Sequence, residues 1–274
     1  MTRVISIINL KGGVGKTFTA ANMAHILNFG HGKSVLLVDN DKQGNLSKLF
    51  SAYQDETESG AAKLLRGWYQ DVNSLRVTLP GYPCMDIIPA NMSLLQATND
   101  LTREESEDQI ERFKALAEAY PLEEGKPYDF IIIDNPPDLG LNVINALAIS
   151  DDVIVPTKVD AWALAGLDVI IEQVEQMKQL NSRLLFRGVL PTMWQNTDTN
   201  ISGMEWLQEK GYKVFESKIW YSVKAPESTF FCQPIVEYAP RSWVAIRYRK
   251  FVAEYMAEIE AEQAADLQEG KEVQ

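Results

Sequence analysis

The chain has 274 residues, of which 46% are hydrophobic and 23% charged, a composition typical of a globular protein with one large α/β domain or two small ones. No apolar run approaches the ~18 residues of a membrane-spanning helix, the apolar first strand leaves no room for a signal peptide, and two cysteines form neither a disulfide framework nor a metal cluster, so we expect a cytoplasmic protein. The net charge of −12 is concentrated in residues 101–125 and 251–274, which leaves the rest of the chain nearly neutral and compatible with a basic face for DNA.

Residues 3–22 predict a strand, a glycine-rich loop and a helix. The β-branched run at 4–8 is typical of a buried parallel strand, and a helical pattern begins at Lys16. Such a turn directs backbone N–H groups and the positive end of the helix dipole at one point, which suits a polyphosphate. We expect Lys16 to neutralise the outer phosphates and Thr17 to ligate the accompanying Mg²⁺. The expected nucleotide-binding residues of this loop are Lys11, Gly12, Gly13, Val14, Gly15, Lys16, Thr17 and Phe18.

A second buried strand is predicted at 34–38, and it ends in Asp39 and Asp41. Carboxylates at the carboxyl end of a parallel strand lie at the crevice where α/β sheets bind ligands. The alternative is that one of the two caps a helix that starts near Gln43, a common duty for aspartate.

A further apolar strand covers residues 130–133 and ends in Asp134, which is followed by Pro136 and Pro137. This is the pattern of a Walker B element, in which the carboxylate usually holds magnesium through a water. The two prolines fix the backbone where the chain leaves the sheet. Taken alone this signal is weak, but together with the glycine loop it indicates a nucleotide site.

The remaining pattern predicts further strands and helices in alternation. Strands are expected at 85–89, 152–156, within 183–193 and at 214–219, and helices at 61–65, 101–119 and 162–180, with a last helix that includes 251–259. Alternating buried strands and helices imply an α/β fold, a mostly parallel twisted sheet with helices on both faces. We expect residues 1–274 to form a single domain with an acidic, frayed tail at about 262–274.

The motifs resemble those of one known family. The strict P-loop pattern is not met, because Leu10 stands where its first glycine would fall, and a second lysine, Lys11, heads the loop. The run KGGVGKT at 11–17 closely resembles the deviant Walker A motif of the ParA/MinD ATPases. Similarly, DNDKQGN at 39–45 resembles the family's D-x-D-x-Q-G-N, and IIIDNPPDLG at 131–140 resembles its IIIDxPPxxG. The resemblance covers about residues 3–256 and implies the P-loop NTPase-like fold.

The resemblance also implies roles for particular residues. In the family the extra lysine, here Lys11, reaches across a dimer interface to the other subunit's nucleotide. The second aspartate, Asp41, positions or activates the attacking water, and the first, Asp39, lies near the magnesium shell. The residues expected to carry catalysis are Lys11, Lys16 and Asp41. Those expected at the metal are Thr17, Asp39 and Asp134, and Arg241 is a candidate contact to the nucleotide because 234–242 resembles the family's adenine-side segment.

The family resemblance implies an ATPase that uses ATP and Mg²⁺, forms a homodimer with ATP, and binds DNA non-specifically as that dimer. A ParB-like centromere-binding protein would stimulate it, and plasmids or chromosome origins would be moved apart, so that the protein would associate with the nucleoid. The chain departs from the family where Tyr221 replaces the first arginine of R-N-V-R. The candidate DNA contacts are Lys218, Lys224, Arg247 and Lys250.

Two alternatives remain open. A MinD-like protein would cycle on a membrane, but that family ends in a basic amphipathic helix, whereas residues 251–274 are acidic here and an anionic surface would repel them. No membrane partner is therefore expected. The second alternative is a nucleotide-gated adaptor that dimerises on a protein partner and hardly turns over.

Overall fold

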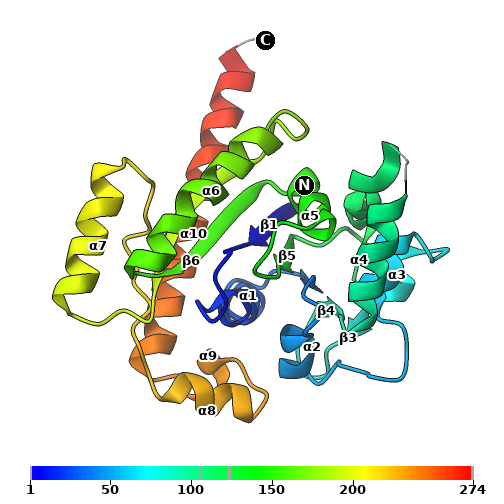
Figure 1. Ribbon diagram of the computed structural model, residues 1–274, viewed down its shortest axis with the longest axis horizontal. Coiled ribbons are helices and arrows are strands. Elements are labelled where there is room, and N and C mark those ends of the chain that lie inside the picture. Colours follow the sequence, from blue (N-terminus) through cyan, green and yellow to red (C-terminus); the bar gives the residue numbers. More distant parts are fainter. Residues whose placement is uncertain (1, 105–106, 122–124, 273–274) are drawn as a thin grey trace.

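The computed structural model describes residues 2–104, 107–121 and 125–272, without the side chains of 107, 161–165 and 266–272. Its centre is a seven-stranded sheet in the order β3-β4-β2-β5-β1-β6-β7, in which β3 alone is antiparallel to its neighbour (Figure 1). The strands are β1 (Arg3–Ile7), β2 (Val35–Asp39), β3 (Val77–Thr78), β4 (Met85–Ile88), β5 (Phe130–Asp134), β6 (Asp152–Lys158) and β7 (Leu185–Thr192). The predicted fold class, a mostly parallel α/β sheet, is confirmed.

Helices join and cover these strands. The α-helices are α1 (Lys16–His25), α2 (Asn45–Leu49), α3 (Gly60–Arg66), α4 (Ser93–Arg103), α5 (Leu141–Ile149), α6 (Ala161–Met177), α7 (Asp198–Glu209), α8 (Lys224–Phe230), α9 (Ile235–Tyr238) and α10 (Trp243–Glu272). A π-helical turn, η1 (Ile26–Gly30), extends α1, and three 3₁₀ segments are η2 (Val72–Leu75), η3 (Glu107–Ile110) and η4 (Arg112–Glu118). Among the described residues, no helix is both long and apolar enough to cross a membrane.

The sheet is buried on both faces, which is why its central strands are continuously apolar. Every residue of β2 and β5 is buried. Along β6, Ile154 packs in the cluster with α1 and α10, whereas its neighbours Val153 and Val155 pack in the cluster with α5 and α6. The third cluster joins β2, β4 and β5 to α3 and α4. The carboxyl ends of β1, β2 and β5, which carry the predicted site, therefore lie side by side and are fixed from both sides.

One predicted helix is wrong. Residues 101–119 do not form an amphipathic α-helix: α4 ends at Arg103, and the chain continues as η3 and η4. After the end of α4, the buried residues of the described part of this stretch are Phe113, Leu116 and Ala119, a spacing of three that fits the 3.0 residues per turn of a 3₁₀ helix. Residues 105 and 106 lie outside the described part of the chain.

The strand expected at 214–219 is also absent from the described structure. The segment makes isolated bridges instead, Val189 with Val214 and Trp194 with Trp220. The N–H of Ile219 donates to the carbonyl of Pro191 at 2.8 Å, but proline has no N–H with which to continue a ladder. The segment therefore runs beside β7 as an irregular loop, and it ends at the site described below.

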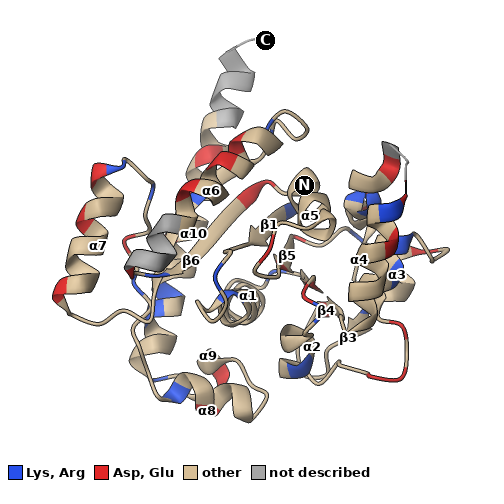
Figure 2. Cartoon of the chain, in the orientation of Figure 1, with Lys and Arg blue, Asp and Glu red and all other residues tan. Residues whose placement is uncertain are grey.

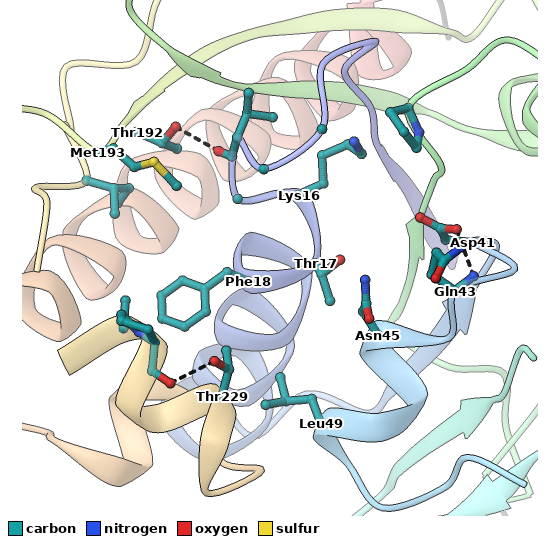
Figure 3. A pocket seen from close by; sticks show the side chains of 18 of the residues that line it. Lys16, Thr17, Phe18, Asp41, Gln43, Asn45, Leu49, Thr192, Met193 and Thr229 are labelled. Atoms are coloured by element: carbon teal, nitrogen blue, oxygen red, sulfur yellow. Dashed lines mark hydrogen bonds between the residues drawn. The ribbon is translucent and has the colours of Figure 1, made fainter. Parts of the chain in front are cut away.

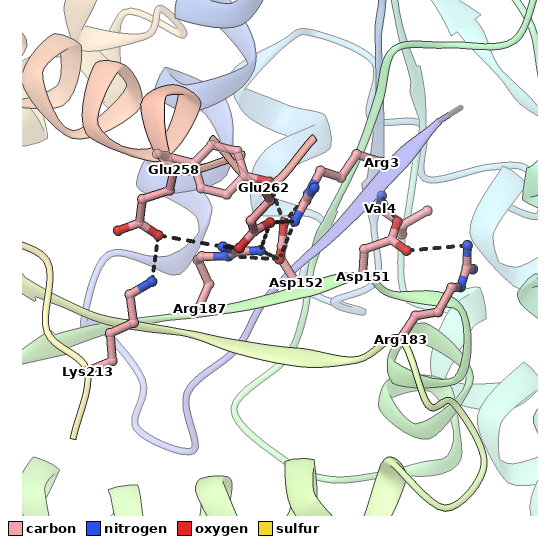
Figure 4. Close-up of polar contacts among 10 residues, drawn as sticks. Arg3, Val4, Asp151, Asp152, Arg183, Arg187, Lys213, Glu258 and Glu262 are labelled. Carbon is pink, nitrogen blue, oxygen red and sulfur yellow. Dashed lines mark hydrogen bonds and ion pairs between the residues drawn. The ribbon is translucent and has the colours of Figure 1, made fainter. Parts of the chain in front are cut away.

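The amino end of the sheet is tied to α10 by buried charges (Figure 4). Asp152, fully buried, accepts from Nε of Arg3 at 2.5 Å and from Nη2 of Arg187 at 2.6 Å, and the Tyr255 hydroxyl donates to it at 2.6 Å. Both arginines also bind Glu262. These partners hold the pKa of Asp152 below its ordinary value despite its burial.

The same network bears on the expected tail. Glu262 pairs with both arginines, and α10 extends as a helix to Glu272; the frayed tail expected at about 262–274 stays a prediction. Residues 273 and 274, and the side chains from 266 onward, lie outside the described part.

Candidate nucleotide site

Glycines shape the loop after β1. Gly13 and Gly15 have φ values of +72° and +93°, in the left-handed region where a side chain is strained. A Cβ on Gly15 would meet no atom closer than Thr192 Cγ2 at 3.9 Å, so backbone conformation, and not crowding, requires glycine there. Because Gly15 is the N-cap of α1, the loop directs the unpaired N–H groups of the helix start into the space that it encloses.

A cavity of about 850 Å³ opens beside this loop, a size that suits a nucleotide. Its walls come from residues 12–18, 41–49, 136–138, 192–193 and 219–232 and from Val244 and Tyr248 of α10. In Figure 3, Lys16 and Thr17 lie between Asp41 on one side and Phe18 and Thr229 on the other. One end of the cavity is therefore charged and the other largely apolar, as a triphosphate and a base require.

Lys16 and Asp134 form the electrostatic centre of the site. Lys16 is buried, which lowers the pKa of its ammonium, and Asp134, Asp41 and Asp138 oppose that change. Its Nζ donates to the carbonyl of Lys11 at 3.3 Å. Burial raises the pKa of Asp134 well above its ordinary value, with Asp39 adding to the rise, while Thr17 and Lys16 oppose it.

The residues present fit a magnesium ion. The two carboxyl oxygens of Asp134 are buried and have no hydrogen-bond partner among the described residues, an arrangement that is costly unless something else satisfies them. The described residues contain no group of three His, Cys, Asp or Glu side chains that could hold a metal without other ligands. Mg²⁺ keeps waters and is usually held by one or two carboxylates plus phosphate oxygens, so Thr17 and Asp134 suit an ion that arrives with a nucleotide.

Asp39 lies opposite Asp134 in the strand register, and both of its carboxyl oxygens accept hydrogen bonds from neighbouring groups. Its Oδ2 accepts from the backbone N–H of Ser47 at 2.8 Å and from the Ser47 hydroxyl at 2.6 Å, and its Oδ1 accepts from the N–H of Asp41 at 3.2 Å. Ser47 in turn accepts from the N–H of Ala90 at 2.9 Å. These bonds hold the Asp41 loop against α2, and the contribution of Asp39 to the magnesium shell, which the family resemblance implies, stays a prediction.

The stability of the protein should depend on pH through Asp39. This carboxyl is buried, and burial raises its pKa from 3.8 to about 6. Because the folded-state pKa is the higher one, Asp39 favours the folded state below pH ~4, and that contribution is lost as pH rises through ~6. Without nucleotide or Mg²⁺, Asp39→Asn should gain stability over wild type by up to about 3 kcal/mol between pH 4 and pH 7. Urea unfolding at several pH values measures this difference, and a constant offset between the two proteins would contradict it.

Asp41 closes a turn and also lines the cavity. Its Oδ1 accepts from the N–H of Gln43 at 2.9 Å (Figure 3), which closes the turn before α2, whose N-cap is Gly44. Gly44 has φ +63°, and a Cβ there would lie 2.7 Å from the carbonyl of Ala90, so glycine is required. The side chain of Asp41 nonetheless lines the cavity, with its second oxygen available to a ligand.

Lys11 stands apart from the cavity that its own loop forms. Its Nζ lies 2.7 Å and 2.9 Å from the two carboxyl oxygens of Asp160, just beyond β6, and Lys11 is not among the described residues that line the cavity. Both side chains are partly exposed, and such a pair contributes about 1 kcal/mol or less. The ammonium is therefore easily transferred to another anion.

The apolar end of the cavity was largely missed by the sequence reasoning. Arg241 is exposed and is not among the described residues that line the cavity, so its contact to the nucleotide stays a prediction. Met193, Thr229 and Tyr248 line this end instead, and the Thr192 hydroxyl donates to the carbonyl of Val14 at 2.8 Å. These residues come from β7, α8 and α10, which local sequence patterns do not relate to one another.

A set of buried asparagines holds the ends of β2 and β5 and the start of α5 together, and it was also missed. The Asn40 amide donates to Oδ1 of Asn135 at 2.8 Å and to the carbonyl of Asn142 at 3.0 Å, and Asn142 donates back to the carbonyl of Asn40 at 3.0 Å. Asn40 lies between the two aspartates of D-x-D, and Asn135 follows Asp134. The bonds therefore fix the segments that carry Asp41 and Asp134 relative to each other.

The cations expected to bind DNA lie on the side of α8 and α10. Lys224 pairs with Glu227 at 2.6 Å and Lys250 is exposed, whereas Lys218 and Arg247 each lie over a tryptophan ring. A surface ion pair such as that of Lys224 exchanges readily for a phosphate.

This fold and this site define a P-loop-type nucleotide-binding ATPase with a deviant phosphate loop. Residues 2–186 match the family described as AAA domain. The chain is 36% identical to the sporulation initiation inhibitor protein Soj of Bacillus subtilis over 94% of this chain and 99% of that protein, and 34% identical to the chromosome-partitioning ATPase Soj of Thermus thermophilus over 94% and 97%. The chain therefore belongs to the AAA-domain family and to its Soj/ParA ATPases, as the motifs predicted.

A solved structure has the same fold. Cobyrinic acid a,c-diamide synthase from Mycobacterium smegmatis, with a bound ATP analogue and magnesium, has 27% sequence identity and a TM-score of 0.79 and covers 95% of this chain and 96% of its own. The resemblance confirms the P-loop NTPase-like fold.

Proposed function

We propose that the chain, as one ATPase domain over residues 1–274, is a partition ATPase that pairs as a homodimer around ATP and Mg²⁺. The observation that carries the proposal is the position of Lys11. A loop lysine whose ammonium lies on Asp160, outside its own cavity, is free to serve a nucleotide held by a second copy. A dimer that completes its site in this way forms with ATP and separates after hydrolysis, because the added contact exists in one state and not in the other.

Within each chain, the loop amides of residues 12–17 and Lys16 would hold the phosphates. Thr17 and Asp134 would hold Mg²⁺, the former directly and the latter through water. When bound, Mg²⁺ neutralises charge on the phosphates during transfer. Phe18, Met193 and Tyr248 would enclose the base.

Hydrolysis would depend on positioning and charge. The carboxylate of Asp41 lines the cavity near Lys16, and it would orient the water for in-line attack on the terminal phosphate. Lys16 and the partner's Lys11 would stabilise the negative charge of the transition state.

The output of the cycle is proposed from the relatives that are named chromosome-partitioning ATPases. The ATP-bound dimer would bind DNA non-specifically through Lys218, Lys224, Arg247 and Lys250, and a ParB-like centromere-binding protein would stimulate hydrolysis. The protein would then be found in the cytoplasm on the nucleoid.

The position of Lys11 gives a direct test. Lys11→Ala should bind ATP within about twofold of wild type, because Lys11 does not line its own cavity, yet it should stay monomeric with ATP and Mg²⁺ where wild type dimerises. Light scattering measures the mass and calorimetry the affinity.

Lys158→Ala is the matched control for this test, since Lys158 Nζ lies 3.7 Å from the same Asp160, and it should still dimerise. A wild-type protein that stays monomeric with ATP, or a Lys11→Ala variant that dimerises as well as wild type, refutes the dimer. Duplex DNA that is not retained with ATP refutes the partition function.

A further inference from the structure

Residues 218–250 differ in charge from the rest of the chain. They carry six Lys or Arg and two Asp or Glu, whereas the net charge of the whole chain is −12. Figure 2 shows blue stretches on α8 and on the first turns of α10, while α6 and α7 carry red ones. This part of the surface therefore attracts anions although the protein is acidic.

Large apolar side chains are exposed within this basic region. Phe230 is 82% exposed and Trp243 is 73% exposed, and three others are more than half exposed. We call the five together the aromatic face; its members are Tyr221, Val223, Phe230, Phe231 and Trp243. Several large apolar groups left in water within one basic stretch of the chain indicate a binding surface.

The aromatic and basic side chains share one helix face. Trp243, Arg247 and Lys250 occupy positions i, i+4 and i+7 of α10, which lie one above the other. The Arg247 guanidinium lies 5.9 Å from the ring centroid of Trp220, directly before Tyr221. The start of α10 is therefore joined to the loop that carries Tyr221.

That loop is fixed by backbone contacts. Trp194 accepts from the N–H of Tyr221 at 3.0 Å and donates to Ile219 at 2.9 Å, and Lys218 Nζ lies 4.1 Å from the centroid of the Trp194 ring. Trp220 and Tyr221 also line the nucleotide cavity. A ligand in the cavity thus touches the segment that presents Tyr221 at the surface.

Charge and geometry favour one occupant. A symmetric contact between two copies would bring the same cations together and repel itself, whereas a polyanion is complementary. In duplex DNA the base faces are covered by their neighbours, so exposed rings would gain nothing from phosphate contacts alone. Unpaired bases offer free π-faces, and a positive groove with aromatic rings is the usual means of holding a single strand.

We propose that this surface binds single-stranded DNA, with Tyr221 and Trp243 stacking on unpaired bases and Lys218, Arg247 and Lys250 contacting phosphates. The inference rests on the proposed ATP-dependent DNA binding and names a strand form that the dimer would prefer. During partition it would direct the ATP-bound protein to unwound segments.

The test compares a 30-nucleotide oligo(dT) with a 30-base-pair duplex by fluorescence anisotropy, with ATP and Mg²⁺ at several salt concentrations. Wild type should bind oligo(dT) more tightly than the duplex. Trp243→Ala and Tyr221→Ala should each lower oligo(dT) affinity about tenfold, as expected for one lost stacking contact, and change duplex affinity less than twofold. Trp243→Phe should restore most of the loss, and Lys250→Glu should weaken both forms and reduce the salt slope.

Trp68→Ala is the matched control, because Trp68 is 63% exposed after α3, and it should change neither affinity. Equal binding of the two DNA forms, or equal loss on both in Trp243→Ala, overturns the stacking proposal and leaves the partition function standing. No binding to either form with ATP overturns both. If Trp243→Ala loses the ATP dimer but not DNA binding, the aromatic face contacts a second copy, and the proposal is overturned. If it loses binding to phosphatidylglycerol vesicles but not to DNA, the face contacts a membrane, and the proposal is overturned as well.

Discussion

Lys16→Ala is expected to lose ATP binding by about 10²–10³-fold, which corresponds to about 3–4 kcal/mol and lies in the range of a desolvated charge contact to a phosphate. The ammonium is buried at the centre of the site and is the cation that balances Asp134, Asp41 and Asp138. Without ATP binding the dimer should not form either. Wild type with ATP at about 100 times its Kd should gain about 2.7 kcal/mol of stability, and the variant at the same ATP concentration should gain less than about 0.5 kcal/mol.

Calorimetry and thermal unfolding with and without ATP and Mg²⁺ measure this effect. Lys178→Ala serves as the control, because this lysine lies after the end of α6 and pairs with Glu175 at the surface, and it should retain the full stabilisation by ATP. If Lys16→Ala retained wild-type affinity, the phosphates would have to lie elsewhere, and the assignment of the cavity would be wrong.

The phosphate-binding part of the site was predictable because its determinants are local. The apolar run, the glycines and Lys16 follow one another within fourteen residues, and each constrains backbone or charge at its own position. The strand ends carrying Asp41 and Asp134 were found in the same way, since a buried parallel strand that ends in aspartate is a short-range pattern.

The roles of the other site residues depend on tertiary contacts, which the sequence alone does not reveal. The role of Asp39 depends on Ser47 and Ala90, which meet it through α2 and β4, and the asparagine contacts join residues about one hundred positions apart. Arg241 does not line the cavity, because resemblance places a segment near the cavity but does not say which side chain turns into it. Tyr248, seven residues after Arg241, lines the cavity from the buried face of α10.

The irregular segments failed for a related reason. Over a short stretch, a spacing of three among buried side chains at 113, 116 and 119 is compatible with either an α-helix or a 3₁₀ helix. The packing of this segment against α5 and α3 decides between these two conformations. At 214–219 the apolar pattern of a strand is present, but its neighbour β7 contains Pro191. A ladder forms only if the neighbouring strand has the N–H and carbonyl groups to pair with. The sequence of one segment does not show whether its neighbour has them.

Asp41→Ala is expected to reduce ATP hydrolysis by about 10²–10³-fold, the range for a residue that orients or deprotonates the attacking group, while the ATP dimer persists. Asp41 lines the cavity, and in Figure 3 it lies on the other side of Lys16 and Thr17 from Phe18, so its loss should spare ATP binding. The lost bond to the Gln43 N–H should cost about 1 kcal/mol of stability. Phosphate release measures the rate and light scattering the dimer.

Asp41→Asn distinguishes a catalytic role of the Asp41 carboxylate from its structural role in closing the turn before α2. Asparagine can accept the same bond from Gln43, which Asp41 makes at 2.9 Å, and it keeps the size of the side chain but loses the negative charge. If the carboxylate orients the water, Asp41→Asn should be as slow as Asp41→Ala although its stability returns to that of wild type. If Asp41 serves only to close the turn before α2, the asparagine variant should hydrolyse ATP normally, and the catalytic role would have to be given to another group that lines the cavity.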